Sequence, residues 1–199
     1  MDNYEQNILA LYFSPRKLSN SGTLLDCALD TASVRGIEIR KINVRDYNIL
    51  PCDSCDKCLS GAPCPIADDM GVIYDALEKS GAIIISTPIY FYGVPAKAKA
   101  MIDRCQTFWA RKYLHASPLP LGRHAAVIAV GGSAGEKVAE GVRLTLKYFL
   151  DALSIEMPDM LVIRNASRVP GELPESELRR ARIYGNKFAE KIKEGRCEN

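Results

Sequence analysis

Residues 81–86 read GAIIIS, a short and continuous apolar run. A strand without polar residues at alternate positions is typical of a parallel sheet, where helices cover both faces. Similar runs lie on either side of it, separated by segments with helical periodicity. We expect strands at residues 7–13, 37–44, 81–86, 125–130 and 160–164. We expect helices at residues 21–35, 96–109, 136–153 and 175–194, and one that opens at residues 68–69.

This alternation predicts an α/β fold, a doubly wound five-stranded parallel sheet with helices on both faces. The chain has 199 residues, which suits one domain. Because no internal repeat or linker interrupts the pattern, we expect a single domain over residues 1–199. The one irregular insertion is a cysteine-rich loop at residues 51–66.

Composition excludes several classes of function. The formal net charge is only +2, whereas nucleic-acid binding needs a concentrated basic face. No apolar run approaches the roughly 18 residues that span a bilayer. The first six residues, MDNYEQ, are polar and do not resemble a signal peptide. We therefore expect a cytoplasmic protein without a nucleic-acid or membrane partner.

The loop after the first strand points to a phosphate. Residues 14–21 read SPRKLSNS and run directly into the first helix. In an open α/β sheet, ligands bind at the carboxyl ends of the strands, and free helix N–H groups favour anions. The candidate phosphate ligands are Ser14, Arg16, Ser19, Asn20 and Ser21. The same serines could simply cap the helix, so both interpretations stay open.

The sequence lacks the motifs of several classes of phosphate-binding protein. It contains no GxxxxGK[ST] motif of nucleoside triphosphatases, and no GxGxxG motif follows the first strand. The first loop has no cysteine, which excludes the chemistry of low-molecular-weight tyrosine phosphatases. A receiver domain needs an aspartate where Thr87 stands.

Two further segments are predicted at the same edge of the sheet. After the third strand, an aromatic stretch suits a planar ring system or a contact with another subunit. After the fourth strand, glycines allow a ligand to approach the backbone closely, although a tight turn needs them too. The candidate residues are Pro88, Ile89, Tyr90, Phe91, Tyr92, Gly93, Gly131, Gly132, Ser133 and Gly135.

Four cysteines crowd into the loop at residues 51–66: Cys52, Cys55, Cys58 and Cys64. Their spacing approaches the C-x2-C-x2-C-x3-C-P run of bacterial ferredoxins, with a longer final gap. Zinc ribbons instead separate two CxxC pairs by a dozen or more residues. The spacing favours a 4Fe–4S cluster, while zinc and unmetallated thiols remain alternatives.

Other polar residues are interpreted as structural. We expect Lys97, Lys99, Asp103 and Arg104 to form a solvated helix face. Neither histidine lies beside a nucleophile motif, so a hydrolytic triad is unsupported and no catalytic side chain is assigned.

Two stretches, SPRKLSNSGTLL and TPIYFYGVPAKAKAMIDR, resemble the NADPH-dependent FMN reductase family of flavodoxin-like proteins. With PCDSCDKCLSGAPCPIADDM added, the chain is most similar to the iron–sulfur flavoproteins. The resemblance implies a flavodoxin-like sheet of order 2-1-3-4-5 and FMN as cofactor. It implies that the FMN phosphate meets the first loop, that the ring meets residues 88–93, and that residues 131–135 lie on the other edge. It also implies a homodimer or homotetramer.

The expected function is that of an FMN-dependent oxidoreductase. Electrons would pass from ferredoxin or NAD(P)H, through FMN and a 4Fe–4S cluster, to oxygen, peroxide, flavin or a quinone. One alternative is an NAD(P)H-dependent FMN or quinone reductase without a cluster. Two others are a non-enzymatic electron carrier and a zinc-stabilised binding module.

Overall fold

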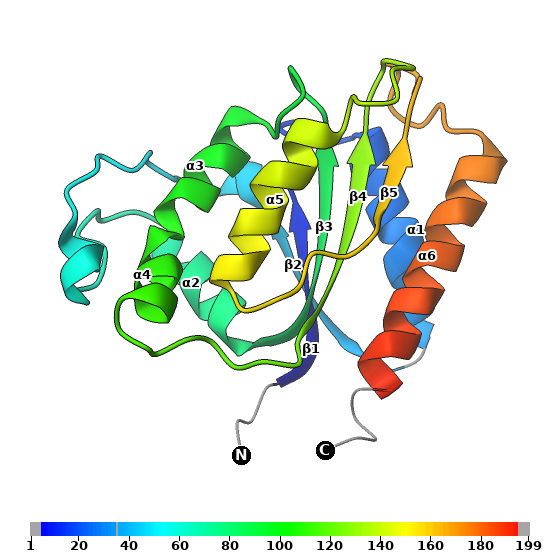
Figure 1. Cartoon of the computed structure of the whole chain (residues 1–199). Coiled ribbons are helices and arrows are strands. Elements are labelled where there is room, and N and C mark those ends of the chain that lie inside the picture. Colours follow the sequence, from blue (N-terminus) through cyan, green and yellow to red (C-terminus); the bar gives the residue numbers. More distant parts are fainter. Residues whose placement is uncertain (1–4, 35, 195–199) are drawn as a thin grey trace.

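The computed structural model describes residues 5–34 and 36–194. Its centre is a five-stranded parallel sheet of order β2-β1-β3-β4-β5 (Figure 1). The strands are β1 (Glu5–Tyr12), β2 (Glu38–Asn43), β3 (Ser80–Pro88), β4 (His124–Val130) and β5 (Met160–Ile163). The predicted strands, their order and their parallel direction are confirmed.

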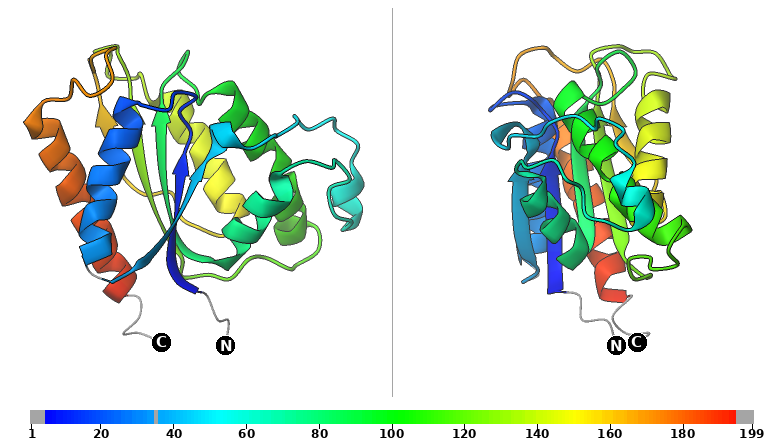
Figure 2. Two further views of the ribbon diagram at one scale, coloured as in Figure 1. Left: turned by 180° about the vertical axis from the view of Figure 1, so that it is seen from behind. Right: turned by 90° about the vertical axis from the view of Figure 1, so that its left-hand side faces the viewer.

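Helices cover both faces of the sheet, as predicted (Figures 1 and 2). One face carries α1 (Asn20–Val34) and α6 (Glu175–Glu194). The other carries α2 (Met70–Lys79), α3 (Ala96–Arg104), α4 (Gln106–Tyr113) and α5 (Glu140–Ala152). Two short 3-10 helices, η1 (Val44–Asp46) and η2 (Lys57–Ser60), lie between β2 and α2.

The central strand β3 shows why the layers form. Ala82 and Ile84 face the core beneath α1 and α6, whereas Ile83 and Ile85 face the core beneath the other helices. All four side chains are fully buried. Because successive strand residues point to opposite faces, only a continuous apolar run can fill both cores.

Two predicted helices differ from the structure by more than one residue at an end. The helix expected at residues 96–109 is two helices, because the chain turns at Cys105, whose N–H bonds to Ile102 O at 2.9 Å. The second of them continues to Tyr113. The helix expected from residue 136 begins at Glu140, after turns in which Val138 N–H bonds to Gly135 O at 3.2 Å. Apolar periodicity continues through such turns and hides them.

In residues 5–34 and 36–194, no helix is both long and apolar enough to cross a membrane. The interpretation of the polar N-terminus falls mainly on residues 1–4, which lie outside the described part of the chain.

The α1–α6 contact yields a stability prediction. Gly185 of α6 lies against the backbone of Ala28 in α1, so closely that a Cβ there would overlap the Ala28 carbonyl. Gly185→Ala should therefore lower the free energy of unfolding by about 3 kcal/mol. The melting temperature should fall by roughly 6–12 °C.

Gly71→Ala in α2 is the matched control, because a Cβ there meets no atom within 4 Å. It should leave stability unchanged or raise it by up to about 1 kcal/mol. Equal melting temperatures for the two variants in thermal unfolding would contradict the close helix contact.

Candidate functional site

A cavity of about 140 Å³ opens at the carboxyl edge of the sheet, between the first loop and the loops after β3, β4 and β5. Nine of the predicted residues line it: Ser14, Arg16, Ser19, Asn20, Ser21, Pro88, Ile89, Tyr90 and Gly132. The remaining lining residues were not predicted: Val130, Ala166, Ser167, Arg168 and Pro170. The signal that could have found Ala166, Ser167, Arg168 and Pro170 is topology, since the segment after β5 reaches the same edge.

The serines of the first loop have different roles. Ser19 Oγ accepts the Gly22 N–H at 3.1 Å and thus caps α1. Ser14 and Ser21 are almost fully buried, and Ser21 Oγ lies 3.4 Å from Ser19 Oγ. Hydroxyls and the first turn of α1 therefore meet at one wall of the cavity. This donor set suits a phosphate ester.

Asn20 joins the first loop to the segment after β5. Its Nδ2 donates to Ser167 O at 2.8 Å, and its Oδ1 accepts the Gly171 N–H at 3.0 Å. Arg16 makes a parallel link, from Nη1 to Arg168 O at 3.2 Å. The Asn20 amide thus supports the cavity wall, while the Arg16 guanidinium sits at its rim.

The aromatic segment is a tight turn. Tyr90 and Gly93 exchange two backbone hydrogen bonds of 2.9 Å. The two residues between them, Phe91 and Tyr92, have φ angles of 49° and 64°. Tyr90 lines the cavity, whereas the Phe91 side chain is fully exposed and Tyr92 is mostly so. Left-handed backbone at two bulky residues is strained and is concentrated at functional sites.

The glycine segment contributes mainly through Gly132. Gly131 is buried, and a Cβ there would lie 3.3 Å from Ile89 Cδ1. Ser133 and Gly135 are exposed and bond to each other, with Gly135 N–H donating to Ser133 Oγ at 3.3 Å. Pro88 and Ile89 add apolar side chains to the lining of the cavity. The carboxyl edge therefore offers hydroxyls and a helix start for a phosphate beside apolar groups for a planar ring, the two parts that FMN combines.

The cysteine loop projects from the body beyond α4, and α4 packs against η2 (Figures 1 and 2). Its four cysteines, Cys52, Cys55, Cys58 and Cys64, all line a second cavity of about 750 Å³. Cys52 and Cys55 are exposed, while Cys58 and Cys64 are half-buried. Burial raises the pKa of the Cys58 thiol, and its three partner thiols raise it further.

The loop backbone turns left-handed at Ser54, Asp56 and Gly61. Asp56, with φ 56° and ψ 9°, directly precedes the right-handed turn of η2. Such pairs of opposite hand point successive N–H groups into one concavity, an arrangement found at iron–sulfur sites. The loop therefore offers both thiol ligands and backbone donors.

Within the described ranges, no group of three or more histidine, cysteine, aspartate or glutamate side chains is arranged to hold one metal ion. Four thiolates around a single zinc must converge to bond lengths of about 2.3 Å. Four thiolates are the ligand set of a 4Fe–4S cluster and of a structural zinc site alike.

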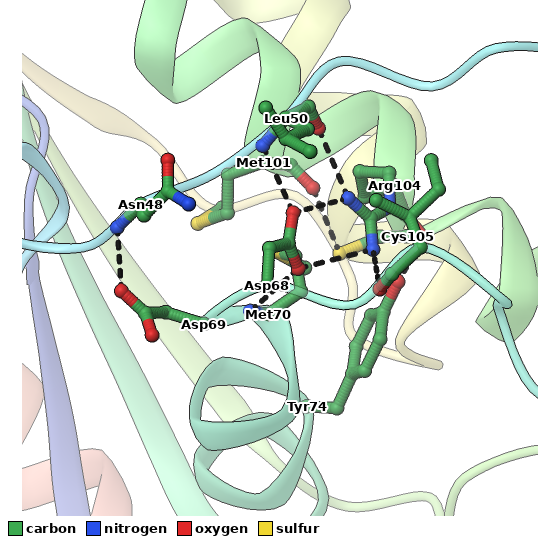
Figure 3. Close-up of polar contacts among 10 residues, drawn as sticks. Asn48, Leu50, Asp68, Asp69, Met70, Tyr74, Met101, Arg104 and Cys105 are labelled. Carbon is green, nitrogen blue, oxygen red and sulfur yellow. Dashed lines mark hydrogen bonds and ion pairs between the residues drawn. The ribbon is translucent and has the colours of Figure 1, made fainter.

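The two ends of this loop meet in a neck formed by residues 48–50 and 66–69 (Figure 3). Asn48 N–H donates to Asp69 Oδ2 at 2.6 Å, and Asp69 N–H donates back to Asn48 O at 3.0 Å. Leu50 N–H donates to Asp68 Oδ2 at 2.9 Å. Asp68 Oδ1 also accepts the Met70 N–H at 3.0 Å, which satisfies a donor in the first turn of α2.

Arg104 completes the neck, and the prediction that it is solvated is wrong. Its side chain is 1% exposed and pairs with the Asp68 carboxylate, at 2.6 and 3.2 Å. The guanidinium also donates to Leu50 O at 3.0 Å and to Ile66 O at 3.3 Å. Burial alone would raise the pKa of Asp68, but the Arg104 bonds hold it below its usual range. Helical spacing did not reveal this because the partner lies in a distant loop.

Several known proteins are similar to this chain in sequence or in fold. The model of the NADPH-dependent FMN reductase family matches residues 6–165. An iron–sulfur flavoprotein of Archaeoglobus fulgidus is 31% identical over 177 residues, which cover 89% of this chain and 76% of that protein. Iron-sulfur flavoprotein MJ1083 of Methanocaldococcus jannaschii is 27% identical over 198 residues, covering 94% and 97% of the two chains.

Among solved structures, the NAD(P)H:quinone oxidoreductase from Methanothermobacter marburgensis superposes with a TM-score of 0.74. The alignment covers 91% of this chain and 94% of that one, at 21% identity, and therefore bears on the fold alone. Family and fold agree with the resemblance found in the sequence. The chain belongs to the NADPH-dependent FMN reductase family and is an FMN-dependent oxidoreductase whose relatives include iron–sulfur flavoproteins.

Proposed function

We propose that the cavity at the carboxyl edge holds FMN, with its phosphate at the first loop. Ser14, Ser21 and the first turn of α1 would bind the phosphate, and the Arg16 guanidinium would neutralise it. The isoalloxazine ring would lie along residues 88–93, with residues 131–135 at its other edge. This proposal is supported by the convergence of nine predicted residues on one cavity.

We further propose that the cysteine loop carries a 4Fe–4S cluster bound by Cys52, Cys55, Cys58 and Cys64. The observation that carries this proposal is that all four thiols line one cavity. The names of the relatives, iron–sulfur flavoproteins, support it. Thiolates are the ligands that iron–sulfur clusters require.

The overall function is then electron transfer between a donor and a small acceptor. Bound flavin supplies the exchange between one- and two-electron steps. The protein would bind the phosphate, contact the ring through Pro88 and Ile89, and provide backbone N–H groups. The family supports NAD(P)H as donor. Ferredoxin is a second donor to test, and the acceptors to test are oxygen, peroxide, flavin and quinones.

A reductase without a cluster is the second candidate, and a specific observation favours it. Cys52 and Cys55 are exposed, so their thiols can serve as free groups as readily as cluster ligands. The measurement that separates the two is the content of iron and acid-labile sulfide per FMN after purification without air. Near four of each supports the cluster; FMN without iron, even after reconstitution, leaves the simpler reductase.

We also propose a homodimer or homotetramer. Phe91 stands fully exposed beside the cavity, on a turn whose strained backbone keeps the ring outside. An exposed aromatic on a rigid turn loses little entropy when another subunit covers it.

The phosphate proposal predicts a difference between neighbouring cations. Arg16 lines the cavity and Lys17 does not. Arg16→Gln should weaken FMN binding roughly 10-fold, because a charge-assisted hydrogen bond is lost. Lys17→Gln is the matched control and should have little effect. Riboflavin, which lacks the phosphate, should bind both variants like the parent protein in fluorescence titrations; an equal loss for riboflavin would contradict the assignment.

The cluster proposal predicts a selective loss of iron. Cys58→Ser replaces a soft thiolate ligand with a hard hydroxyl and should reduce the content of iron and sulfide by more than half. FMN content should remain unchanged. Cys27→Ser, in α1 and away from the loop, serves as the control. Equal iron in both variants would contradict the ligand set.

The oligomer proposal is tested by sedimentation velocity. Phe91→Asp should shift the protein toward a smaller species, because a charge at the centre of an interface is desolvated without a partner. Leu121→Asp is the control: Leu121 is 78% exposed and precedes β4, at the other end of that strand from the cavity. Identical sedimentation of both variants and the parent protein would count against this contact.

A further inference from the structure

The span between Cys52 and Cys64 has few ties to the rest of the protein. Most of its hydrogen bonds stay within the loop, such as Cys55 N–H to Asp53 Oδ1 at 3.2 Å and Gly61 N–H to Cys58 O at 3.1 Å. One tie reaches the body, where His115 Nε2 lies 3.1 Å from Leu59 O. The placement of the four thiols therefore depends strongly on how the two ends of the loop are held.

Arg104 is the residue that touches both ends. Its guanidinium bonds to Leu50 O, two residues before Cys52, and to Ile66 O, two residues after Cys64. Arg104 and Cys64 also line the same two cavities beside the loop. Arg104 therefore joins both ends of the loop, and Figure 3 shows its hydrogen bonds to Leu50 and Asp68.

Stability alone is a poor explanation for a fully buried arginine here. A buried ion pair offsets its own desolvation only when every donor is satisfied, and apolar replacements are often equally stable. Arg104 Nε has no hydrogen-bond partner among the described atoms. The unsatisfied donor belongs to a residue that lines the same cavities as Cys64, which points to a role in the cysteine loop.

We propose that Arg104 is a positioning residue for the metal centre: it closes the neck so that the four cysteines are held ready for a cluster. This inference rests on the proposed function. Closing the ends beforehand reduces the conformational entropy lost when the thiols converge. A fixed cation beside Cys64 also favours the more negative, reduced state of a cluster, and thus raises its reduction potential.

The test compares three variants of the full chain, purified and reconstituted without air. Arg104→Lys keeps the charge but loses the planar fork that reaches Leu50 and Ile66. The double variant Asp68→Leu with Arg104→Met replaces the buried pair by apolar groups and should fold. Arg111→Met is the matched control, because Arg111 belongs to an exposed pair with Glu78, with side chains 38% and 44% exposed.

The main readout is the rate at which a strong iron chelator removes iron. The double variant should lose iron about 10- to 100-fold faster than the parent, while its FMN content stays the same. Arg111→Met should match the parent protein. Arg104→Lys should lose iron at an intermediate rate yet keep the parent reduction potential and the parent electron paramagnetic resonance signal. Parent-like iron loss in a folded double variant would overturn the proposal.

A measurement on the metal-free protein separates the proposed role of Arg104 from the cluster proposal on which it rests. If the parent protein takes up no iron or sulfide, the cluster proposal fails on its own. Hydrogen exchange of the amides at residues 48–50 and 66–69 then tests the neck in the metal-free protein. These amides should exchange faster in the double variant than in Arg111→Met, and equal exchange would overturn the role of Arg104.

Discussion

All five strands run parallel, and this constraint determines where chemistry can occur in the molecule. Parallel strands require helical crossovers, so every strand ends at the same edge of the sheet. Four separate loops are thereby brought to one rim: the first loop, the turn at Tyr90–Gly93, the glycine segment and the segment after β5. The buried β3 strand holds the arrangement together, since its side chains alternate between the two cores.

Apolar periodicity was sufficient to predict the elements of this fold, because burial on two faces leaves a strong pattern in β3 and an amphipathic one in the helices. It was not sufficient for their ends. Cys105 belongs to the apolar stripe of a continuous helix, yet the chain turns there. The turns before Glu140 are likewise stabilised by local hydrogen bonds. Such bonds have no periodic signature.

At the candidate site, the sequence revealed residues that lie close together along the chain. It did not reveal side chains that pair over a long distance in the sequence. Serines beside a helix start are a local signal, and so is a run of cysteines. Arg104 resembles its solvated neighbours Lys99 and Asp103 until Asp68 is brought against it from 36 residues away. The outward position of Phe91 follows from two left-handed residues that no sequence rule favours in aromatics.

The neck also has an evolutionary consequence. Its bonds come from residues 48–50, residues 66–69 and Arg104, all outside the span between Cys52 and Cys64. Insertions, deletions or loss of thiols within that span remove none of these bonds, and surface loops typically tolerate such changes. Descendants of such a protein can therefore acquire, resize or discard a metal centre by changing one short segment. The rim of the sheet that we propose for FMN can then change independently of this segment.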